Sequence, residues 1–295
     1  MKIVLTGSSG RVGRAIFNAL AADHQVIGID RSPFSTTQIT GDFADLNLLR
    51  LAMDGADAVI HTAALHAPHV GLVPDAEFDR INVDGTRLII EAAKAAGVKR
   101  CVFTSTTALF GKTSENNVCA WVTEETVPQP RSIYHHTKLA AEKLLSEAAD
   151  EHFVVRVIRM SRCFPETADV MALYRLNRGI DVRDVASAHV AALTNTGLAF
   201  ERYIISGATP FTEHDCFLLA TDPAAIIRTK LPELLNEFEK RGWHIPESID
   251  RVYVSKKAAA LGWRMQYGFE EVMAQLDRGS LEVLPVGIWM NKREE

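Results

Sequence analysis

The 295-residue sequence has few cysteines, no excess of positive charge and no long apolar run. Its four cysteines are widely spaced and form no CxxC pair, so we interpret them as reduced core thiols and expect no metal site. The formal net charge of −5 provides no basic surface for nucleic acid. No apolar run can cross a bilayer, and a strand begins already at Lys2, which predicts a cytoplasmic protein without a signal peptide or membrane partner.

The first thirty residues form the most informative stretch of the sequence. Residues 2–6 are apolar and β-branched, as in a buried strand, and residues 14–22 carry apolar side chains at helical spacing. Residues 25–29 predict a second strand, which ends on Asp30. Strand, glycine turn, helix, strand and acid together predict a βαβ unit that binds a dinucleotide.

Three glycines connect this strand to its helix. Gly7 permits a tight turn, Gly10 lets the backbone approach a pyrophosphate, and Gly13 lets the helix pack closely on the sheet. The start of the helix offers unpaired N–H groups and a partial positive charge to the phosphates. Asp30 can accept hydrogen bonds from the adenosine ribose. Because Asp30 would repel a 2′-phosphate, we expect NAD rather than NADP.

Strands and amphipathic helices alternate along the rest of the first two thirds of the chain. This alternation predicts an α/β fold, a doubly wound parallel sheet of the Rossmann type, with ligands at the carboxyl ends of the strands. We expect a dinucleotide-binding domain over residues 1–193 and a smaller, mainly helical, substrate-side lobe over residues 194–295. The predicted strands are 56–64, 99–105, 153–159 and 203–206, and the predicted helices are 46–53, 81 onward, 134–149, 181–193 and 231–241.

Tyr134 and Lys138 stand four residues apart, so they share one face of a predicted helix. A tyrosine with a pKa of about 10 is a poor base at neutral pH. An ammonium group within ~4–6 Å lowers such a pKa by about one to three units, and an oxidised nicotinamide adds a second positive charge. Thr106 ends a predicted strand at the same rim and can hydrogen-bond the same substrate oxygen.

These motifs resemble the extended short-chain dehydrogenase/reductases, also called the NAD-dependent epimerase/dehydratase family. The resemblance covers the chain from Met1 to about Leu193 and is specific, whereas the last hundred residues indicate no substrate. It implies a homodimer through the helices near 82–96 and 134–149. The matching segments are residues 6–13, 41–42, 61–64, 82–86, 103–106, Tyr134 with Lys138, and 183–186.

The resemblance also implies individual roles. Tyr134 would be the general acid/base, Lys138 would lower its pKa and bind the nicotinamide ribose, and Thr106 would orient the substrate oxygen. The predicted cofactor contacts are Gly7, Ser9, Gly10, Arg11, Val12, Gly13, Asp30, Arg31, Asp42, Phe43, Ala63, Ala64, Asn82 and Lys138. The predicted substrate contacts are Thr106, Thr107, His135 and Arg162.

Several of these assignments have an alternative. Asp42, which would lie beside the adenine ring, can instead cap a helix together with Asp45, and Asn82 can cap the helix it begins. His135 and His136 either contact substrate or face solvent. Arg162 either binds a substrate carboxylate or phosphate or forms a surface salt bridge.

Two departures from the family pattern narrow the reaction. Thr107 and Ala108 stand where the family's dehydratases carry Asp-Glu, which argues against dehydration and leaves hydride transfer as net oxidation, reduction or epimerisation. Arg162 replaces the Asn of nucleotide-sugar enzymes, and the stretch after it is short, as in the sugar-acid (uronate) dehydrogenases. We therefore expect an NAD-dependent oxidoreductase acting at a secondary hydroxyl of a small polyol or sugar acid. The alternatives are a nucleotide-sugar epimerase and a non-catalytic NAD(P)-sensing protein.

Overall fold

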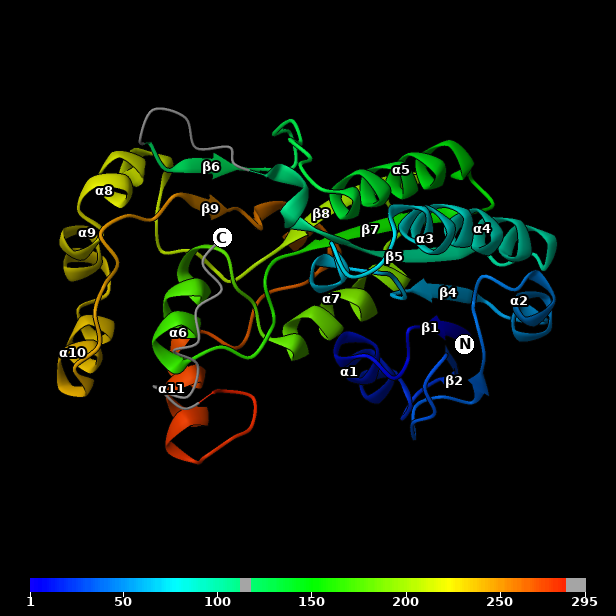
Figure 1. The fold of residues 1–295 in the computed structure, drawn as a ribbon, viewed down its shortest axis with the longest axis horizontal. Coiled ribbons are helices and arrows are strands. Elements are labelled where there is room, and N and C mark those ends of the chain that lie inside the picture. Colours follow the sequence, from blue (N-terminus) through cyan, green and yellow to red (C-terminus); the bar gives the residue numbers. More distant parts are fainter. Residues whose placement is uncertain (112–117, 285–295) are drawn as a thin grey trace.

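A seven-stranded sheet forms the centre of the molecule (Figure 1). The computed structural model describes residues 1–111 and 118–284. The strand order is β3-β2-β1-β4-β5-β7-β8, and each described strand pairing in this sheet is parallel. The predicted doubly wound α/β fold is thereby confirmed. The strands are β1 (Lys2–Thr6), β2 (Gln25–Asp30), β3 (Ile39–Thr40), β4 (Ala58–His61), β5 (Arg100–Thr106), β7 (Val154–Met160) and β8 (Phe200–Ile205).

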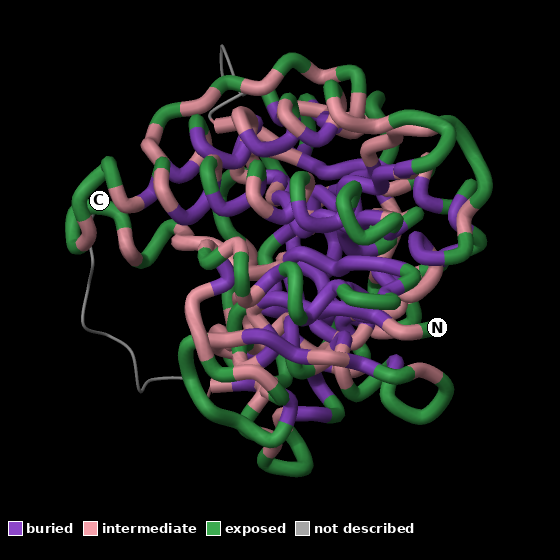
Figure 2. The backbone as a smooth tube through the Cα atoms, turned by 90° about the vertical axis from the view of Figure 1, so that its right-hand side faces the viewer, coloured by how far each residue is buried: buried purple, intermediate pink, exposed green. Residues whose placement is uncertain are grey.

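Helices cover both faces of this sheet (Figure 1). Successive side chains of a strand point to opposite faces. Accordingly, Ile3 and Leu5 pack with α1 and α7, whereas Val4 packs with α2, α4 and α5. Buried residues gather along the middle of the molecule and exposed ones along its outer loops (Figure 2). The covering helices are α1 (Arg11–Leu20), α2 (Leu46–Met53), α4 (Gly85–Ala95), α5 (Ile133–Ala148) and α7 (Val182–Thr194).

The strand order reverses at β1. The chain passes from β1 through α1 to β2 on one side, and β4 pairs with the opposite side of β1. In an open parallel sheet, the loops that follow the two strands at such a point diverge and leave a crevice at the carboxyl ends of the strands. The fold thus places the glycine turn after β1 beside the segment that follows β4.

A smaller lobe packs beyond the end of the sheet and has its own apolar core (Figure 1). Its segments come from both sides of residue 193, since β6 and α6 precede that position. Conversely, β8 follows residue 193 but belongs to the large sheet. The boundary between domains 1–193 and 194–295 remains a prediction, and residues 285–295 lie outside the described part of the chain. The elements are β6 (Ala120–Val122), α6 (Ala168–Asn177), α8 (Cys216–Thr221), α9 (Pro223–Lys230), α10 (Pro232–Arg241), β9 (Arg251–Tyr253) and α11 (Phe269–Asp277).

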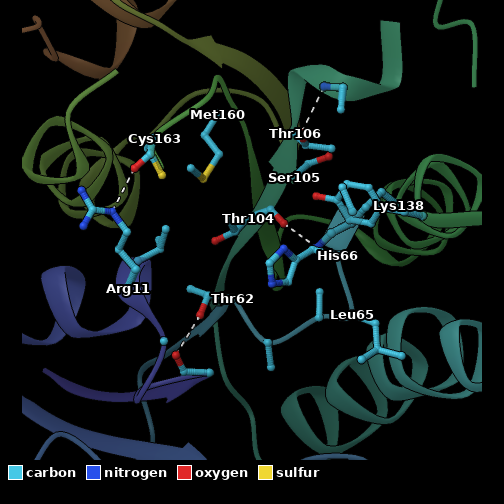
Figure 3. A pocket seen from close by; sticks show the side chains of 18 of the residues that line it. Arg11, Thr62, Leu65, His66, Thr104, Ser105, Thr106, Lys138, Met160 and Cys163 are labelled. Carbon is cyan, nitrogen blue, oxygen red and sulfur yellow. Dashed lines mark hydrogen bonds between the residues drawn. The ribbon is translucent and has the colours of Figure 1, made fainter. Parts of the chain in front are cut away.

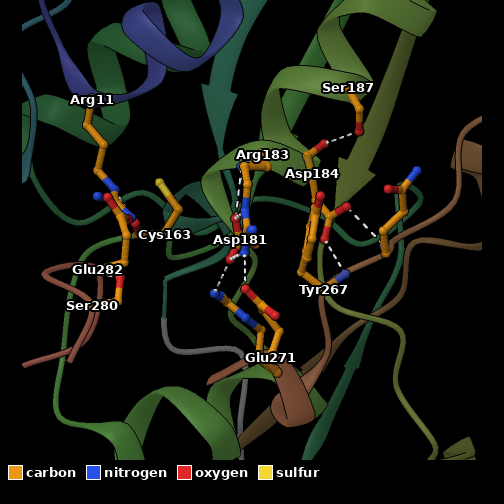
Figure 4. A network of polar contacts seen from close by, with 12 residues as sticks. Arg11, Cys163, Asp181, Arg183, Asp184, Ser187, Tyr267, Glu271, Ser280 and Glu282 are labelled. Atoms are coloured by element: carbon orange, nitrogen blue, oxygen red, sulfur yellow. Dashed lines mark hydrogen bonds and ion pairs between the residues drawn. The ribbon is translucent and has the colours of Figure 1, made fainter. Parts of the chain in front are cut away.

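The Arg-Asp-Val-Ala motif connects the sheet to this lobe (Figure 4). Arg183, in α7, bonds through Nε to Asp181 Oδ1 at 2.8 Å and through Nη2 to Glu271 Oε1 of α11 at 2.9 Å. The carboxylate of Asp184, which is buried, accepts a hydrogen bond from the backbone N–H of Tyr267 at 3.0 Å. Side chains of one turn of α7 thus bind two segments of the C-terminal region.

Two local features differ from the predicted pattern. The helix expected from residue 81 starts earlier, because α3 (Asp75–Phe78) leads through a π-helical turn (Asp79–Asp84) into α4. The region after residue 160, which lacks a clear periodicity, contains α6. Within residues 1–111 and 118–284, no helix has the length and apolar character needed to cross a membrane.

Candidate active site

One cavity of about 1020 Å³ runs along the carboxyl ends of the strands (Figure 3). Its wall begins at the glycine turn after β1 and passes the ends of β2, β4, β5 and β7. It ends against the smaller lobe, at residues that include Arg178, Arg251 and Tyr253. We call the end at the glycine turn, where the sequence predicts the cofactor, the cofactor end, and the opposite end the lobe end.

The glycine turn fits a dinucleotide. Gly7 has a φ of +74°, and a Cβ there would lie 2.6 Å from Thr62 Oγ1. A Cβ on Gly13 would lie 2.0 Å from the carbonyl oxygen of Gly7, so this position needs glycine for the turn itself. A Cβ on Gly10 would meet only that same oxygen, at 3.3 Å. The missing side chain of Gly10 consequently leaves free space on the cavity wall for a pyrophosphate.

The N-terminus of α1 adjoins this space. Gly10 is its N-cap, and no side chain caps the helix among the described residues. The first-turn residues Arg11, Val12 and Gly13 line the cavity together with Ser9. Uncapped N–H groups at a helix start favour an anion. Arg11 turns its side chain across to the C-terminal region, where Nε donates to the carbonyl oxygen of Cys163 at 2.9 Å and the guanidinium pairs with Glu282 (Figure 4).

Asp30 lines the cavity at the end of β2. Its two carboxylate oxygens accept the backbone N–H groups of Ser9 and Ser32, each at 3.0 Å, which hold the side chain at the cavity wall. Arg31 also lines the cavity, but its Nη2 lies 2.7 Å from Asp42 Oδ2. Asp30 is therefore the negative charge that a bound adenosine ribose would meet.

Asp42 and Asn82 do not line the cavity. Asp42 pairs with Arg31 and Arg80, while Phe43 beside it lines the wall. The cap predicted as the alternative for Asp42 is present in part, because Asp45 caps α2 and the Asp42 carboxylate accepts the N–H of Ala44 in the preceding turn. The cap predicted for Asn82 is absent, because Asp84 is the N-cap residue of α4.

Asn82 acts through the segment after β4. Its Oδ1 accepts the N–H of Leu65 at 2.8 Å, and its Nδ2 donates to the Leu65 carbonyl at 2.9 Å and to Thr137 Oγ1 at 3.0 Å. Ala63 and Ala64, which precede Leu65, line the cavity. The buried Asn82 amide thus fixes this wall against α5, and any effect of Asn82 on a cofactor is indirect.

The three predicted catalytic side chains meet on one part of the wall. Ser132 caps α5 by accepting the N–H of His135, so that Tyr134 and Lys138 lie in the first two turns. Thr106 ends β5 and accepts the N–H of Ala108 at 3.1 Å. Burial raises the pKa of Tyr134 to about 12, and the neighbouring Thr106 hydroxyl acts in the opposite direction.

The side chain of Lys138 is buried in the cavity wall, near the end of β5 (Figure 3). Its Nζ donates to the carbonyl oxygen of Thr104 at 2.8 Å and lies 4.5 Å from the ring centre of Phe103. Burial lowers the pKa of Lys138 to about 7, against the opposing effect of Glu142. Burial is the largest influence on Tyr134 and raises its pKa. The lowering expected from Lys138 together with an oxidised nicotinamide stays a prediction.

The predicted substrate contacts lie toward the lobe end of the cavity. Thr107 is buried and lines the wall, as does the half-buried His135, whereas His136 is exposed and lies outside it. Burial lowers the pKa of His135, and His136 and Arg131 act in the same direction. Arg162 also lines the wall, but its Nε donates to Glu166 Oε1 at 2.6 Å. Arg162 therefore forms the predicted surface ion pair and also lies on the cavity wall, although these were predicted as alternatives.

Several wall residues lack a signal in the sequence. Some lie within recognised segments, such as Thr62 and Ser105, or directly follow Arg162, as Cys163 does. Others lie on elements with no distinctive pattern, because a three-residue strand and the end of an irregular helix carry no periodicity. Arg131, Arg178, Asp250, Arg251 and Tyr253 belong to this second group. Within the described residues, no three or more His, Cys, Asp or Glu side chains gather to hold a metal ion.

Comparisons with known proteins agree with this geometry. A model of the family described as "NAD dependent epimerase/dehydratase family" matches residues 3–169. The L-arabinose 1-dehydrogenase (NAD(P)(+)) of Haloferax volcanii is 34% identical over 167 residues, 51% of this chain and 62% of that protein. The N-acetyl-alpha-D-glucosaminyl-diphospho-ditrans,octacis-undecaprenol 4-epimerase of Escherichia coli O157:H7 is 34% identical over 150 residues, 49% of this chain and 43% of that protein. The matches thus span less than two thirds of either relative.

The likeness in structure extends further along the chain. A short-chain dehydrogenase/reductase superfamily protein from Agrobacterium tumefaciens, crystallised with bound NAD, matches with a TM-score of 0.70 and 20% identity, covering 94% of this chain and 98% of that one. That match supports the fold. The family model covers more than half of the chain, and its residues form the cavity wall from the glycine turn to α5. The chain therefore belongs to the NAD-dependent epimerase/dehydratase family.

Proposed function

We propose that the chain is an NAD-dependent oxidoreductase that transfers hydride at a secondary hydroxyl carbon of a small, sugar-like substrate. One observation carries this proposal. Thr106, Tyr134 and Lys138 line the same cavity as the glycine turn and Asp30. A protein that only senses NAD needs the glycine turn and Asp30 but no acid/base group. The presence of Tyr134 and Lys138 in the same cavity therefore supports an enzyme.

The wall residues can divide the chemistry among them. When bound, oxidised NAD supplies the hydride acceptor and a positive charge on its nicotinamide ring. Thr106 orients the substrate hydroxyl, and Tyr134 takes the proton from that oxygen as hydride leaves the carbon. A general base of this kind contributes about 10² to 10⁴ in rate. Because Lys138 is fixed on Thr104, it can bind a ribose hydroxyl and add positive charge near Tyr134.

The side chains after Thr106 support hydride transfer without elimination. Thr107 and Ala108 line the wall where acids would be needed for dehydration, and neither can move a proton at neutral pH. A nucleotide-sugar epimerase remains the alternative enzyme, because epimerisation requires the same tyrosine and lysine. The short stretch between Arg162 and the Arg-Asp-Val-Ala motif favours a substrate smaller than a nucleotide sugar.

A screen of substrates with NAD tests this proposal. Purified protein is incubated with NAD and with neutral aldoses, uronates, aldonates or sugar phosphates, and NADH is followed by absorbance. We expect NADH from at least one small sugar, formed about 10² to 10⁴ times more slowly by the Tyr134→Phe variant. A protein that binds NAD but forms no NADH, and epimerises a nucleotide sugar, would support the alternative enzyme. Binding of NAD without any turnover across both panels would indicate a sensor.

The quaternary structure is a separate proposal. The resemblance to the family suggests a homodimer through α4 and α5, the helices that cover one face of the sheet. Light scattering on the purified chain tests this directly, since a dimer doubles the 32.5 kDa mass of one chain.

A further inference from the structure

The lobe end of the cavity carries an excess of positive charge. Arg131, Arg162, Arg178 and Arg251 line it, and the acidic side chains of the described cavity wall are only Asp30 and Asp250. Asp30 lies at the cofactor end, hydrogen-bonded to Ser9 in the glycine turn. At the end where substrate would bind, the lining therefore contains four guanidinium groups and one carboxylate.

Arg162 has its own counter-ion outside the lining. Its guanidinium bonds with Glu166, four residues further along the chain, and lies 5.5 Å from the ring centre of Phe164. The ion pair neutralises its charge and occupies its Nε and Nη2 donors. Arg162 is thus a poor candidate for the group that recognises an anion.

Arg178 and Arg251 instead form a pair around a single acid. Arg251, at the start of β9, donates from Nε to Asp250 Oδ2 at 2.9 Å and from Nη2 to the same oxygen at 2.6 Å. Arg178, at the end of α6, donates from Nη1 to Asp250 Oδ1 at 3.3 Å. Asp250 balances only one of the two positive charges, so the pair keeps a net charge of about +1.

The surroundings hold this pair in place. The Arg178 guanidinium stacks 4.4 Å above the ring centre of Tyr174 and donates to its hydroxyl at 2.7 Å. The side chain of Arg251 is 13% exposed and also donates to the carbonyl oxygen of Gly111. Because both guanidinium groups are fixed before a ligand arrives, little side-chain freedom is lost when one binds.

The pair is connected to the proposed catalytic residues. Arg251 Nη1 lies 3.4 Å from the hydroxyl oxygen of Tyr253, and that hydroxyl donates to the carbonyl oxygen of Thr107 at 3.2 Å. Thr107 directly follows Thr106. An anionic group bound by the pair would therefore lie close enough to the reacting hydroxyl for both groups to belong to one small molecule.

We propose that Arg178 and Arg251 form an anion-binding subsite for a carboxylate or phosphate group of the substrate, in place of Arg162. The inference rests on the proposed function, because it assigns the class of substrate to the same cavity. The substrate would be a small sugar acid or sugar phosphate, whose anionic group takes up the positive charge that Asp250 leaves unbalanced.

Binding measurements test the subsite without relying on turnover. The NAD-loaded protein is titrated calorimetrically with glucuronate, glucose 6-phosphate and neutral glucose. We expect at least one of the two anions to bind more tightly than glucose, and the better one indicates whether carboxylate or phosphate fits. Arg178→Gln keeps a long polar side chain but loses the charge. It should weaken binding of that anion by roughly ten- to a hundredfold, as for loss of a charge-assisted hydrogen bond, and leave glucose binding unchanged.

Two matched variants separate the subsite from general effects of charge. Arg228→Gln removes the same charge from an exposed position on α9 of the same lobe, outside the cavity wall, and should leave anion binding unchanged. Arg162→Gln is the competing assignment, and a loss of anion binding there with none in Arg178→Gln would overturn the proposal. Equal binding of all three sugars would also overturn it. Arg178-dependent anion binding without NADH formation would refute the proposed oxidoreductase and leave the subsite standing.

Discussion

The ammonium nitrogen of Lys138 lies 2.8 Å from the carbonyl oxygen of Thr104, in the strand that carries the proposed substrate-orienting threonine. This hydrogen bond spans α5 and β5 and fixes the lysine beneath the cavity. The position excludes most water, since the Lys138 side chain is buried and its ammonium group lies over the face of Phe103. The site therefore holds a cation where desolvation disfavours its charge, which has a measurable consequence for stability.

We predict that Lys138→Met stabilises the cofactor-free protein at pH 7, and that this gain shrinks as the pH rises. The folded-state pKa of Lys138 is about 7, below its usual 10.5. Between these values the unfolded chain binds more protons than the folded one, so wild-type stability increases with pH. Melting temperatures at pH 7 and pH 9.5 measure this effect. The exposed Lys143→Met in the same helix serves as the control, and a gain that does not change with pH would contradict the prediction.

Tyr134→Phe should reduce kcat by about 10² to 10⁴, the usual contribution of a general acid or base, and leave the Kd for NAD nearly unchanged. Only the proton-transfer group is lost, while the packing of the ring remains. Because burial raises the pKa of Tyr134 to about 12, the reactive phenolate is scarce at neutral pH, and oxidation should accelerate as the pH rises. Steady-state kinetics over pH 7–10 with a substrate from the screen measure both effects. Near-full activity of the variant would show that the base lies elsewhere.

NAD should bind more tightly than NADP by roughly a hundredfold or more, since two charges about 4 Å apart repel by ~4 kcal/mol at an effective dielectric constant of about 20. Arg31 cannot easily offset this, because Asp42 holds its guanidinium at 2.7 Å. Asp30→Asn should remove most of the preference. Asp42→Asn should leave Arg31 only its longer pairing with Glu77, at 3.8 Å, and so improve NADP binding with Asp30 intact. Fluorescence titrations with both cofactors test each variant, and tighter NADP binding by the wild type would refute the assignment of Asp30.

Glu142→Gln should lower the free energy of unfolding by about 3–5 kcal/mol, the usual cost of removing one partner from a buried ion pair. The buried Glu142 carboxylate accepts two hydrogen bonds from Arg159, at 2.7 and 3.0 Å, and one from Ser105 Oγ at 2.6 Å. Glu147→Gln is the matched control, because its pairing with Lys143 is exposed and the change should cost less than about 0.5 kcal/mol. Urea unfolding of both variants measures the difference, and similar midpoints would count against a buried network.

Local features of this chain were predictable from the sequence. The turn of Gly7 and Gly13, the strand that ends on Asp30, and the shared helical face of Tyr134 and Lys138 all occur in the structure. These features depend on backbone conformation and on residue spacing within a few turns, which hydrophobic periodicity and glycine placement encode directly. The alternation of such units also predicted a parallel, doubly wound sheet, because crossover connections allow few arrangements.

Contacts between distant segments were decided only by the tertiary structure. The sequence spacing of Asn82 does not indicate that its amide joins Leu65 to Thr137, and no pattern links Arg178 to Arg251 through Asp250. The direction of the Tyr134 pKa shift likewise follows from how completely the surrounding elements exclude water. Periodicity specifies which face of an element is buried, whereas partners, charge balance and desolvation depend on which elements meet at that face. For this reason the sequence determined the cofactor end of the cavity, and the packing of the smaller lobe against the sheet determined its lobe end.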